Sequence, residues 1–301
     1  MRAIQISEFG GPEVLKLVDI PTPTVLAGEV LIEVSACGIN YADSHQAENS
    51  YISPQTLPLI PGAEVVGRNA SGQRVVALVP GGGYAEVVSA PAALTFPIPD
   101  GVSDGAALAA ILQGTTAVHL LRTSAHLQSG ESVLVHAAAG GVGTIAVQLA
   151  KLWGAKVIGS ASSAEKRTLV TSLGADSVID PAEADLTAAI LAANGGRKVN
   201  IVLEMTGGKV FDQSLQALAP FGRLVTFGMA SRSMPEPIHT GALMGTSRAV
   251  IGFWLVHCMA RPDRMIAPQL AELFELMESG KVKAVIGGSY PLSEAKRAHE
   301  D

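Results

Sequence analysis

The stretch VLVHAAAGGVG, residues 133–143, decides the fold. A run of β-branched and apolar residues gives way to three alanines and then to three glycines within four positions. This pattern predicts a buried strand that enters a glycine-rich turn, and the run TIAVQLAKLW that follows predicts a helix. Because the free N–H groups and the dipole at the start of a helix attract anions, we expect this turn to bind a pyrophosphate.

Two glycines carry this expectation. Gly140 and Gly143 fall at the second and third glycines of the dinucleotide-binding pattern GxGxxG, and Ala138 occupies the first position. A side chain at Gly140 would block the pyrophosphate, and one at Gly143 would push the helix away from the sheet. No Gly-Lys-Ser/Thr follows, which excludes a P-loop. The alternative is a glycine-rich loop that serves packing alone.

The second strand of this unit indicates which nucleotide is preferred. Its predicted end reads Ser160-Ala161-Ser162-Ser163, with Lys166 and Arg167 just beyond. An acidic residue at this place would bind the ribose 2′-hydroxyl of NADH, and none is present. Hydroxyls and cations suit a 2′-phosphate instead, so NADPH is the expected cofactor. The alternative for Lys166 and Arg167 is an ordinary solvated helix face.

Strand and helix patterns alternate through the middle of the chain. From residue 113 to residue 255 six strand-like runs are separated by helical runs, which predicts a doubly wound parallel sheet. Residues 1–112 alternate short apolar runs with Pro and Gly turns, which is typical of a β-rich domain. After Pro262 we expect a helix, MIAPQLAELFELMESG, and a short strand, KAVIGGSYPL. The fold class is therefore α/β with a second, β-rich domain.

Composition excludes several classes of protein. The net charge of −6 gives no basic footprint for nucleic acid, and no apolar run is long enough to span a membrane. The opening MRAIQISEFGGPE has no apolar core like that of a secretory signal, and only two cysteines occur, Cys37 and Cys258. We therefore expect a cytoplasmic protein without disulfides.

Several segments resemble one known family. AAAGGVGTIAVQLAKLWGAKVIG, LQGTTA (112–117), LEMTGG (203–208), FGMAS (227–231), ACGINYADSHQ (36–46) and the opening MRAIQISEFGGPEVLKLVDIP are similar to the zinc-free quinone oxidoreductases, the zeta-crystallin-like branch of the medium-chain dehydrogenases/reductases. The resemblance implies a GroES-like catalytic domain, 1–112 and 256–301, around a Rossmann NADPH-binding domain, 113–255. It also implies a cleft between them in which NADPH reduces a quinone or an α,β-unsaturated carbonyl.

The resemblance extends to individual residues. It places Asn40 and Tyr41 at the bottom of the cleft and Gln113 and Thr116 near the nicotinamide. Either Tyr41 or Asn40 could donate a hydrogen bond to a substrate carbonyl; the alternatives are a turn residue and a half-buried aromatic. It further implies cofactor contacts from these residues: Gly140, Gly141, Val142, Gly143, Ser160, Ser162, Lys166, Arg167, Phe227, Gly228, Ala230 and Phe253.

Zinc ligands are missing from the places where relatives that use zinc have them. Those relatives resemble CGxCxxD and GHE, whereas this chain has Cys37-Gly38-Ile39-Asn40 and Pro61-Gly62-Ala63-Glu64. One cysteine cannot assemble a catalytic zinc site, and the four-cysteine structural lobe is absent. We expect no metal.

Three segments depart from the family pattern. The stretch 62–78 is short, which could trim the catalytic barrel or open the rim of the pocket. The run Val178-Ile179-Asp180-Pro181, after the third strand, lacks the tyrosine that the family often has there, stacked near the adenosine phosphate. The sequence ends at AHED, where relatives continue into a further strand.

The leading hypothesis is an NADPH-dependent reductase of quinones or enones that needs no zinc. An enoyl or enone reductase of a biosynthetic pathway and a non-catalytic NADPH-binding protein are the alternatives. The sequence does not distinguish hydride transfer from one-electron reduction of a quinone. The resemblance also implies a homodimer through the edge strand of the Rossmann domain, in the run SRAVIGFWL.

Overall fold

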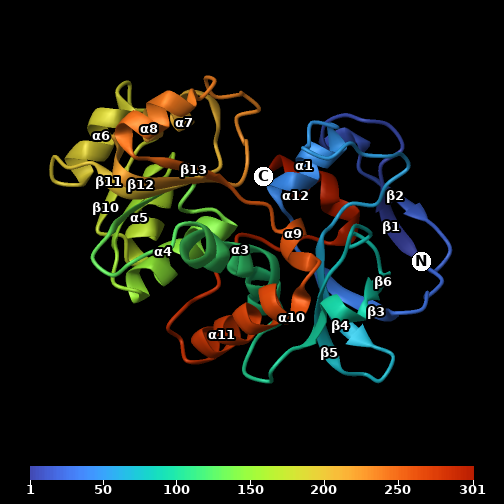
Figure 1. The fold of residues 1–301 in the computed structure, drawn as a ribbon. Coiled ribbons are helices and arrows are strands. Elements are labelled where there is room, and N and C mark those ends of the chain that lie inside the picture. Colours follow the sequence, from blue (N-terminus) through green and yellow to red (C-terminus); the bar gives the residue numbers. More distant parts are fainter. The chain divides into compact units, whose positions relative to one another are not determined.

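The computed structural model describes residues 1–301 (Figure 1). Contacts within the chain divide it into two units, Met1–Leu112 with Cys258–Asp301, and Gln113–His257. The first unit thus combines both ends of the sequence. None of the helices is both long and apolar enough to cross a membrane.

The first unit is built on an antiparallel sheet of five strands in the order β6-β3-β4-β5-β7. A separate pair, β1 and β2, is also antiparallel. Alternating valines and isoleucines turn one face of the larger sheet inward, where Ile32, Val65, Val75 and Val88 form its core. The strands are β1(Arg2–Gln5), β2(Lys16–Asp19), β3(Glu29–Cys37), β4(Glu64–Asn69), β5(Arg74–Leu78), β6(Val87–Pro91) and β7(Thr95–Pro97).

The short stretch 62–78 forms a closed hairpin. Strands β4 and β5 pair from Glu64↔Leu78 to Arg68↔Arg74. Asn69 Oδ1 accepts hydrogen bonds from the N–H groups of Ser71 (3.1 Å) and Gln73 (3.0 Å), and Gly72 has a φ of +79°. The asparagine and the glycine complete the turn, so the β4–β5 pairing needs no additional strand here.

Helices accompany these strands, and two of them, η3 and α9, cross the boundary between the two units. They are η1(Pro12–Val14), α1(Tyr41–Ala47), η2(Ala92–Leu94), α2(Asp104–Leu108), η3(Ala109–Gly114), α9(Val256–Met259), α10(Pro262–Met265), α11(Ala267–Glu278), η5(Leu292–Glu294) and α12(Ala295–Glu300). The helix expected after Pro262 is present as α10 and α11. The strand expected in KAVIGGSYPL is wrong, because residues 283–291 form neither strand nor helix. Two adjacent glycines and Pro291 disfavour a strand there.

The second unit is a parallel sheet of six strands in the order β10-β9-β8-β11-β12-β13. The order runs outward in both directions from β8, which confirms the predicted doubly wound fold. Helices α6 and α7 cover one face, and α4 and α5 cover the other (Figure 1). The strands are β8(Ser132–Val135), β9(Lys156–Ser160), β10(Ser177–Ile179), β11(Val199–Glu204), β12(Leu218–Thr226) and β13(Ala249–Gly252).

The core of this unit explains why its strands are almost wholly apolar. A parallel sheet is buried on both faces, and Leu134, Ile158 and Val202 pack with Leu186 of α6 and Phe211 of α7. The helices are α3(Thr115–Val118), η4(His119–Ser124), α4(Gly141–Leu152), α5(Ala164–Ser172), α6(Leu186–Ala193), α7(Gly208–Ala217) and α8(Thr240–Thr246). This arrangement places the turn 136–140 at the carboxyl edge of the central strand.

Candidate functional site

The glycine-rich turn lies between β8 and α4, as its sequence predicts. Ala138 N–H donates to the carbonyl of Ser160 (2.9 Å), and Gly140 N–H donates to the carbonyl of Ala137 (2.8 Å). Ala137 adopts a φ of +48°, a left-handed conformation that is uncommon for a residue with a side chain. Ala138, in place of the first glycine, does not have a positive φ, so an alanine fits this turn.

The three glycines of the turn differ in what a side chain would meet. A Cβ on Gly143 would lie 2.3 Å from the carbonyl oxygen of Ala137 and 2.7 Å from the Cα of Ala138, so this residue must be glycine for α4 to pack on the turn. A Cβ on Gly140 would meet only that same carbonyl, at 3.2 Å. A Cβ on Gly141 would meet the end of the Gln113 side chain.

The start of α4 offers hydrogen-bond donors to an anion. Gly140 is the N-cap residue of this helix and has no side chain that could accept a hydrogen bond from the first turn. The N–H groups of Gly141, Val142 and Gly143 have no partner inside the helix, because the first N–H groups of any α-helix lack one. This turn fits a pyrophosphate, which would be bound by these N–H groups and by the helix dipole.

Polar side chains follow β9, on the next strand of the sheet. The Ser160 hydroxyl is buried and has no hydrogen-bond partner, and Ser162 and Lys166 are exposed. Arg167 is engaged: its guanidinium donates to the carbonyl of Ala161 and to Asp180 Oδ2, each at 2.8 Å. The sequence analysis did not predict that Asp180, which lies just after β10, pairs with Arg167.

Other residues of the nucleotide-binding prediction lie at the same edge of the sheet. Phe227 N–H donates to the carbonyl of Glu204 (3.0 Å), and Ala230 N–H to that of Met205 (2.8 Å), so the loop after β12, which includes Gly228, is bound to the end of β11. Phe253, which directly follows β13, stacks its ring on His119 at a centroid distance of 5.8 Å.

Gln113 and Thr116, the two residues that the resemblance places near the nicotinamide, precede β8 in the sequence. Gln113 lies against Gly141, and Thr116 is buried in α3. In doubly wound folds ligands bind at the carboxyl ends of the strands, where the glycine-rich turn and the loops after β11, β12 and β13 also lie.

Two buried ionisable groups in this unit escaped the sequence analysis. Glu204 ends β11, and its Oε1 accepts from the N–H groups of Thr206 (2.7 Å) and Gly207 (2.9 Å), while Oε2 has no partner. Burial raises the pKa of Glu204 to about 7. His136 follows β8, bonds through Nε2 to Ser214 Oγ (2.7 Å), and has its pKa lowered to about 4 by burial. The acidic residue within the otherwise apolar run VLEM, residues 202–205, could have identified Glu204 as a buried carboxyl group.

In the other unit Asn40 begins a buried polar network. Its Nδ2 donates to Glu64 Oε1 (2.9 Å) and Oε2 (2.8 Å), and its N–H donates to Asp43 Oδ2 (2.8 Å). Asn40 therefore holds the start of α1 and engages its amide with Glu64. Tyr41 is 51% exposed, with its ring edge-on to His45 at 5.4 Å.

The carboxyl groups of this network are deeply buried and have no cationic partner. Burial raises the pKa of Glu64 to about 8, with a further contribution from the nearby charge of Asp43. Burial likewise raises the pKa of Asp43 to about 6, against the effect of its hydrogen bonds. The Tyr84 hydroxyl donates to Asp43 Oδ2 (3.0 Å) and lies 3.0 Å from His299 Nε2. No local sequence pattern indicates that Tyr84 or His299 belongs to this polar network.

The chain contains no group of three or more His, Cys, Asp or Glu side chains arranged to hold a metal ion. Burial, with the nearby carboxyl groups of Glu64 and Asp43, raises the pKa of Cys37 to about 12. Its sulfur is therefore a thiol and not a thiolate at neutral pH.

Comparisons with known proteins agree along the whole chain. The family profile described as "Alcohol dehydrogenase GroES-like domain" matches residues 26–100, and that described as "Zinc-binding dehydrogenase" matches residues 141–275. The chain is 36% identical over 315 residues to the quinone oxidoreductase of Rattus norvegicus, which covers 100% of this chain and 93% of that protein.

Solved structures are similar over the same length. A mycobacterial protein complexed with NADPH has a TM-score of 0.93 and 37% identity, covering 100% of this chain and 96% of that one. The quinone oxidoreductase of Escherichia coli complexed with NADPH has a TM-score of 0.91 and 32% identity, with coverage of 100% and 95%.

Proposed function

The chain belongs to the quinone oxidoreductase branch of the medium-chain dehydrogenases/reductases, and we propose that it is an NADPH-dependent enzyme that reduces quinones. The observation that carries the proposal is the uncapped start of α4 behind a turn that only glycine at position 143 permits. Its full-length relatives are quinone oxidoreductases, so neither the biosynthetic enone reductase nor the non-catalytic binder is favoured.

The unit Gln113–His257 is the proposed nucleotide-binding part, and the unit formed by both ends of the chain is the proposed catalytic part. The N–H groups of Gly141, Val142 and Gly143 bind the pyrophosphate, and Gly140 leaves room for it. Charge-assisted hydrogen bonds from backbone N–H groups to phosphate are among the stronger ones in proteins.

The 2′-phosphate is held chiefly by Ser162 and Lys166, because both are exposed and Lys166 forms no ion pair. Arg167 contributes its positive charge while Asp180 keeps its guanidinium in place. Ser160 offers a buried hydroxyl that lacks a partner in the protein. This set favours NADPH over NADH, since a 2′-hydroxyl would leave Lys166 without its anion.

When bound, NADPH supplies a hydride. Gln113, Thr116, Phe227, Gly228, Ala230 and Phe253 are the proposed neighbours of the nicotinamide, and they orient it and exclude water. On the substrate side, the exposed Tyr41 hydroxyl can donate to a carbonyl oxygen as negative charge develops there. Asn40 positions Tyr41, since it fixes the start of α1 through Asp43 and Glu64.

Metal ions have no part in this proposal. A zinc site of this family would need ligands beyond Cys37, whose thiol is protonated, and Ala63 stands where a histidine would be.

The test is NADPH oxidation, followed by absorbance, with a panel of ortho- and para-quinones and enones. We expect quinones to be reduced, and Lys166→Gln to raise the KM for NADPH several-fold while the KM for NADH stays unchanged. Lys209→Gln, an exposed lysine at the start of α7, is the matched control. NADPH binding without turnover of any quinone would overturn the proposal.

The proposed assembly is a homodimer in which β13 pairs with its copy. β13 is an edge strand of the six-stranded sheet, and its residues are only partly buried. An edge strand with free backbone groups is a template for such pairing. Sedimentation should give a dimer at micromolar concentration, and a monomer would contradict this part.

A cytoplasmic location completes the proposal and is supported by Cys37 and Cys258 both being free thiols.

A further inference from the structure

A concave site occurs in the Gln113–His257 unit, at the edge of the parallel sheet opposite the glycine-rich turn. It has a volume of about 210 Å³, and its polar lining comes from Ser132, Lys156, Asn194, Arg197, Lys198 and Asn200. Ser132 and Lys156 are the first residues of β8 and β9, and Asn200 is the second residue of β11. The site therefore lies at the amino ends of these strands, whereas the glycine-rich turn lies at the carboxyl end of β8.

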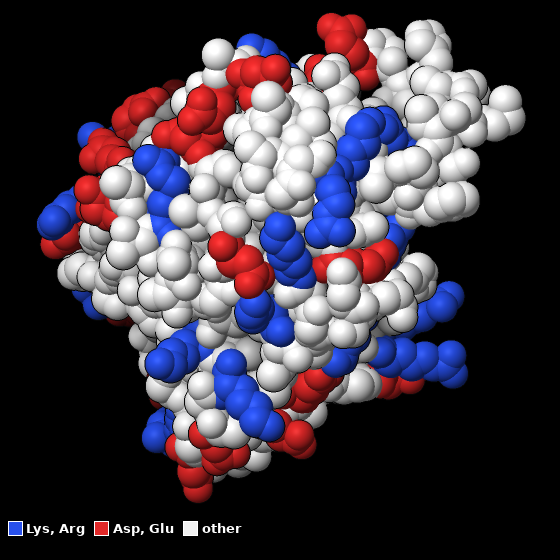
Figure 2. Space-filling model, turned by 90° about the vertical axis from the view of Figure 1, so that its left-hand side faces the viewer, with Lys and Arg blue, Asp and Glu red and all other residues white.

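The lining of this site is cationic and contains no carboxylate. Lys156, Arg197 and Lys198 form no ion pair. The chain as a whole has a net charge of −6, and on the face drawn in Figure 2 Lys and Arg side chains are interspersed with Asp and Glu. Burial, together with the charge of Arg248, lowers the pKa of Lys198. Three positive charges thus line this site, and no carboxylate does.

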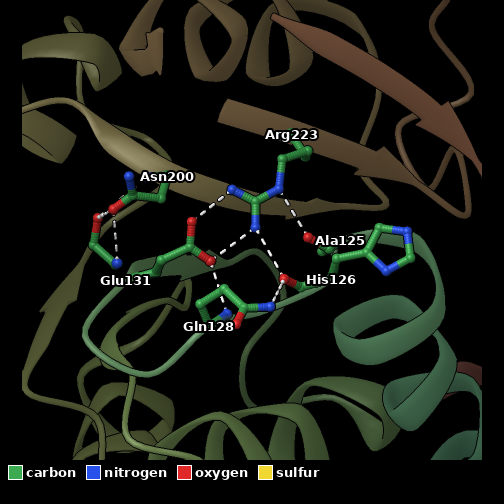
Figure 3. Close-up of polar contacts among 7 residues, drawn as sticks. Ala125, His126, Gln128, Glu131, Asn200 and Arg223 are labelled. Atoms are coloured by element: carbon green, nitrogen blue, oxygen red, sulfur yellow. Dashed lines mark hydrogen bonds and ion pairs between the residues drawn. The ribbon is translucent and has the colours of Figure 1, made fainter. Parts of the chain in front are cut away.

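The nearest carboxylates are already committed to other cations. Glu131, next to Ser132, is held by both terminal nitrogens of Arg223 at 2.6 and 2.8 Å (Figure 3). Asp176 accepts from Lys151 Nζ and from the N–H of Val157. Against desolvation, hydrogen bonds from Lys151 and Val157, and then the charges of Lys151 and Lys156, lower the pKa of Asp176. Neither carboxylate forms an ion pair with Lys156, Arg197 or Lys198.

Two amide side chains add specific hydrogen-bonding capacity. Asn200 Oδ1 accepts from the N–H (3.0 Å) and the hydroxyl (2.9 Å) of Ser132, and its Nδ2 points away from both (Figure 3). Asn194 is 2% exposed, and its Nδ2 donates to the carbonyls of Arg197 (3.1 Å) and Lys198 (3.0 Å). These bonds fix the amide orientation and leave Asn194 Oδ1 buried without a donor. Such an atom is costly to leave unpaired, so it calls for a donor from a ligand.

We propose that this site binds a small phosphate monoester that carries a hydroxyl group. The three cations and Asn200 Nδ2 meet the phosphate oxygens, because all four are donors and three carry charge. The ligand hydroxyl donates to Asn194 Oδ1. The volume of about 210 Å³ admits a phosphate with a short polyol and is small for a dinucleotide.

The test is a calorimetric titration of the full-length protein with glycerol 3-phosphate in the presence of saturating NADPH. Saturation with NADPH occupies any phosphate-binding groups of the nucleotide site, so heat from a second ligand reports another site. We expect one equivalent of glycerol 3-phosphate to bind. Ethyl phosphate, which has no hydroxyl, should bind more weakly, and so should inorganic phosphate.

Variants locate the binding. Arg197→Gln and Lys198→Gln remove exposed charges and should each weaken binding about tenfold, the effect of losing one charge-assisted hydrogen bond. Lys16→Gln, an exposed lysine on β2, is the matched control and should bind as the parent does. The proposal is overturned if no saturable heat is seen, or if both variants bind like the control. Equal affinity for ethyl phosphate would remove the role of Asn194.

Discussion

The close packing of Gly143 against the turn predicts the effect of Gly143→Ala. The added Cβ would lie 2.3 Å from the carbonyl oxygen of Ala137, about 1 Å short of an ordinary 3.4 Å contact. Both nearby atoms belong to the backbone, so no rotamer change relieves the clash, and α4 must move. Overpacking of this kind costs about 3 kcal/mol at its upper end, and the better helix propensity of alanine returns about 1 kcal/mol. We expect a net loss of about 2 kcal/mol in unfolding free energy.

The same displacement moves the N–H donors at the start of α4. NADPH affinity should fall by about tenfold or more, since a bond between a donor and a charged group contributes roughly 1.5–3 kcal/mol. Urea denaturation measures the first effect, and fluorescence titration with NADPH the second. Gly245→Ala in α8 is the control, because nothing lies within 4 Å of its Cβ. Parental stability and parental NADPH affinity in Gly143→Ala would refute the reasoning.

Three further predictions concern other parts of the chain. The pKa of Glu64 is raised to about 8 in the folded protein, so its contribution to stability is full below the unfolded value of 4.5 and is lost as the pH rises towards 8. Thermal denaturation should therefore show a melting temperature that declines between pH 5 and pH 8, and the decline should be shallower in Glu64→Gln. Parallel curves for the parent and the variant would contradict this prediction. Arg223→Ala removes the cation that pairs with Glu131 and the donor to the carbonyl of Ala125, while Gln128 still donates to Glu131 and to the carbonyl of His126. Urea denaturation should show a loss of about 2–4 kcal/mol in unfolding free energy, and a double-mutant cycle with Glu131→Ala that shows no coupling would count against the pair. The atoms nearest to a Cβ on Gly141 are those at the flexible end of the Gln113 side chain, so in Gly141→Ala quinone reduction should slow while thermal stability stays unchanged, and an unaltered rate would argue against Gln113.

Local sequence was enough for the architecture of the Gln113–His257 unit. Apolar runs of strand length alternate with helical runs, and this alternation predicts six parallel strands because each connection must cross the sheet as a helix. The glycine pattern at residues 140–143 likewise predicts the turn, since the requirement for a missing side chain is a property of single positions. A strand in residues 283–292 was predicted from apolar runs alone, and no partner strand pairs with it.

The side-chain partners were decided only by the tertiary structure. Asn40 meets Glu64 across 24 positions, and Tyr84 meets His299 across 215. Asp180 reaches Arg167 from the next strand, although the end of β9 itself contains no acid. The raised pKa of Glu64 follows from burial, which no local pattern encodes. Periodicity and turn residues act over a few positions and fix the elements, whereas contacts and dielectric surroundings arise when distant segments pack together.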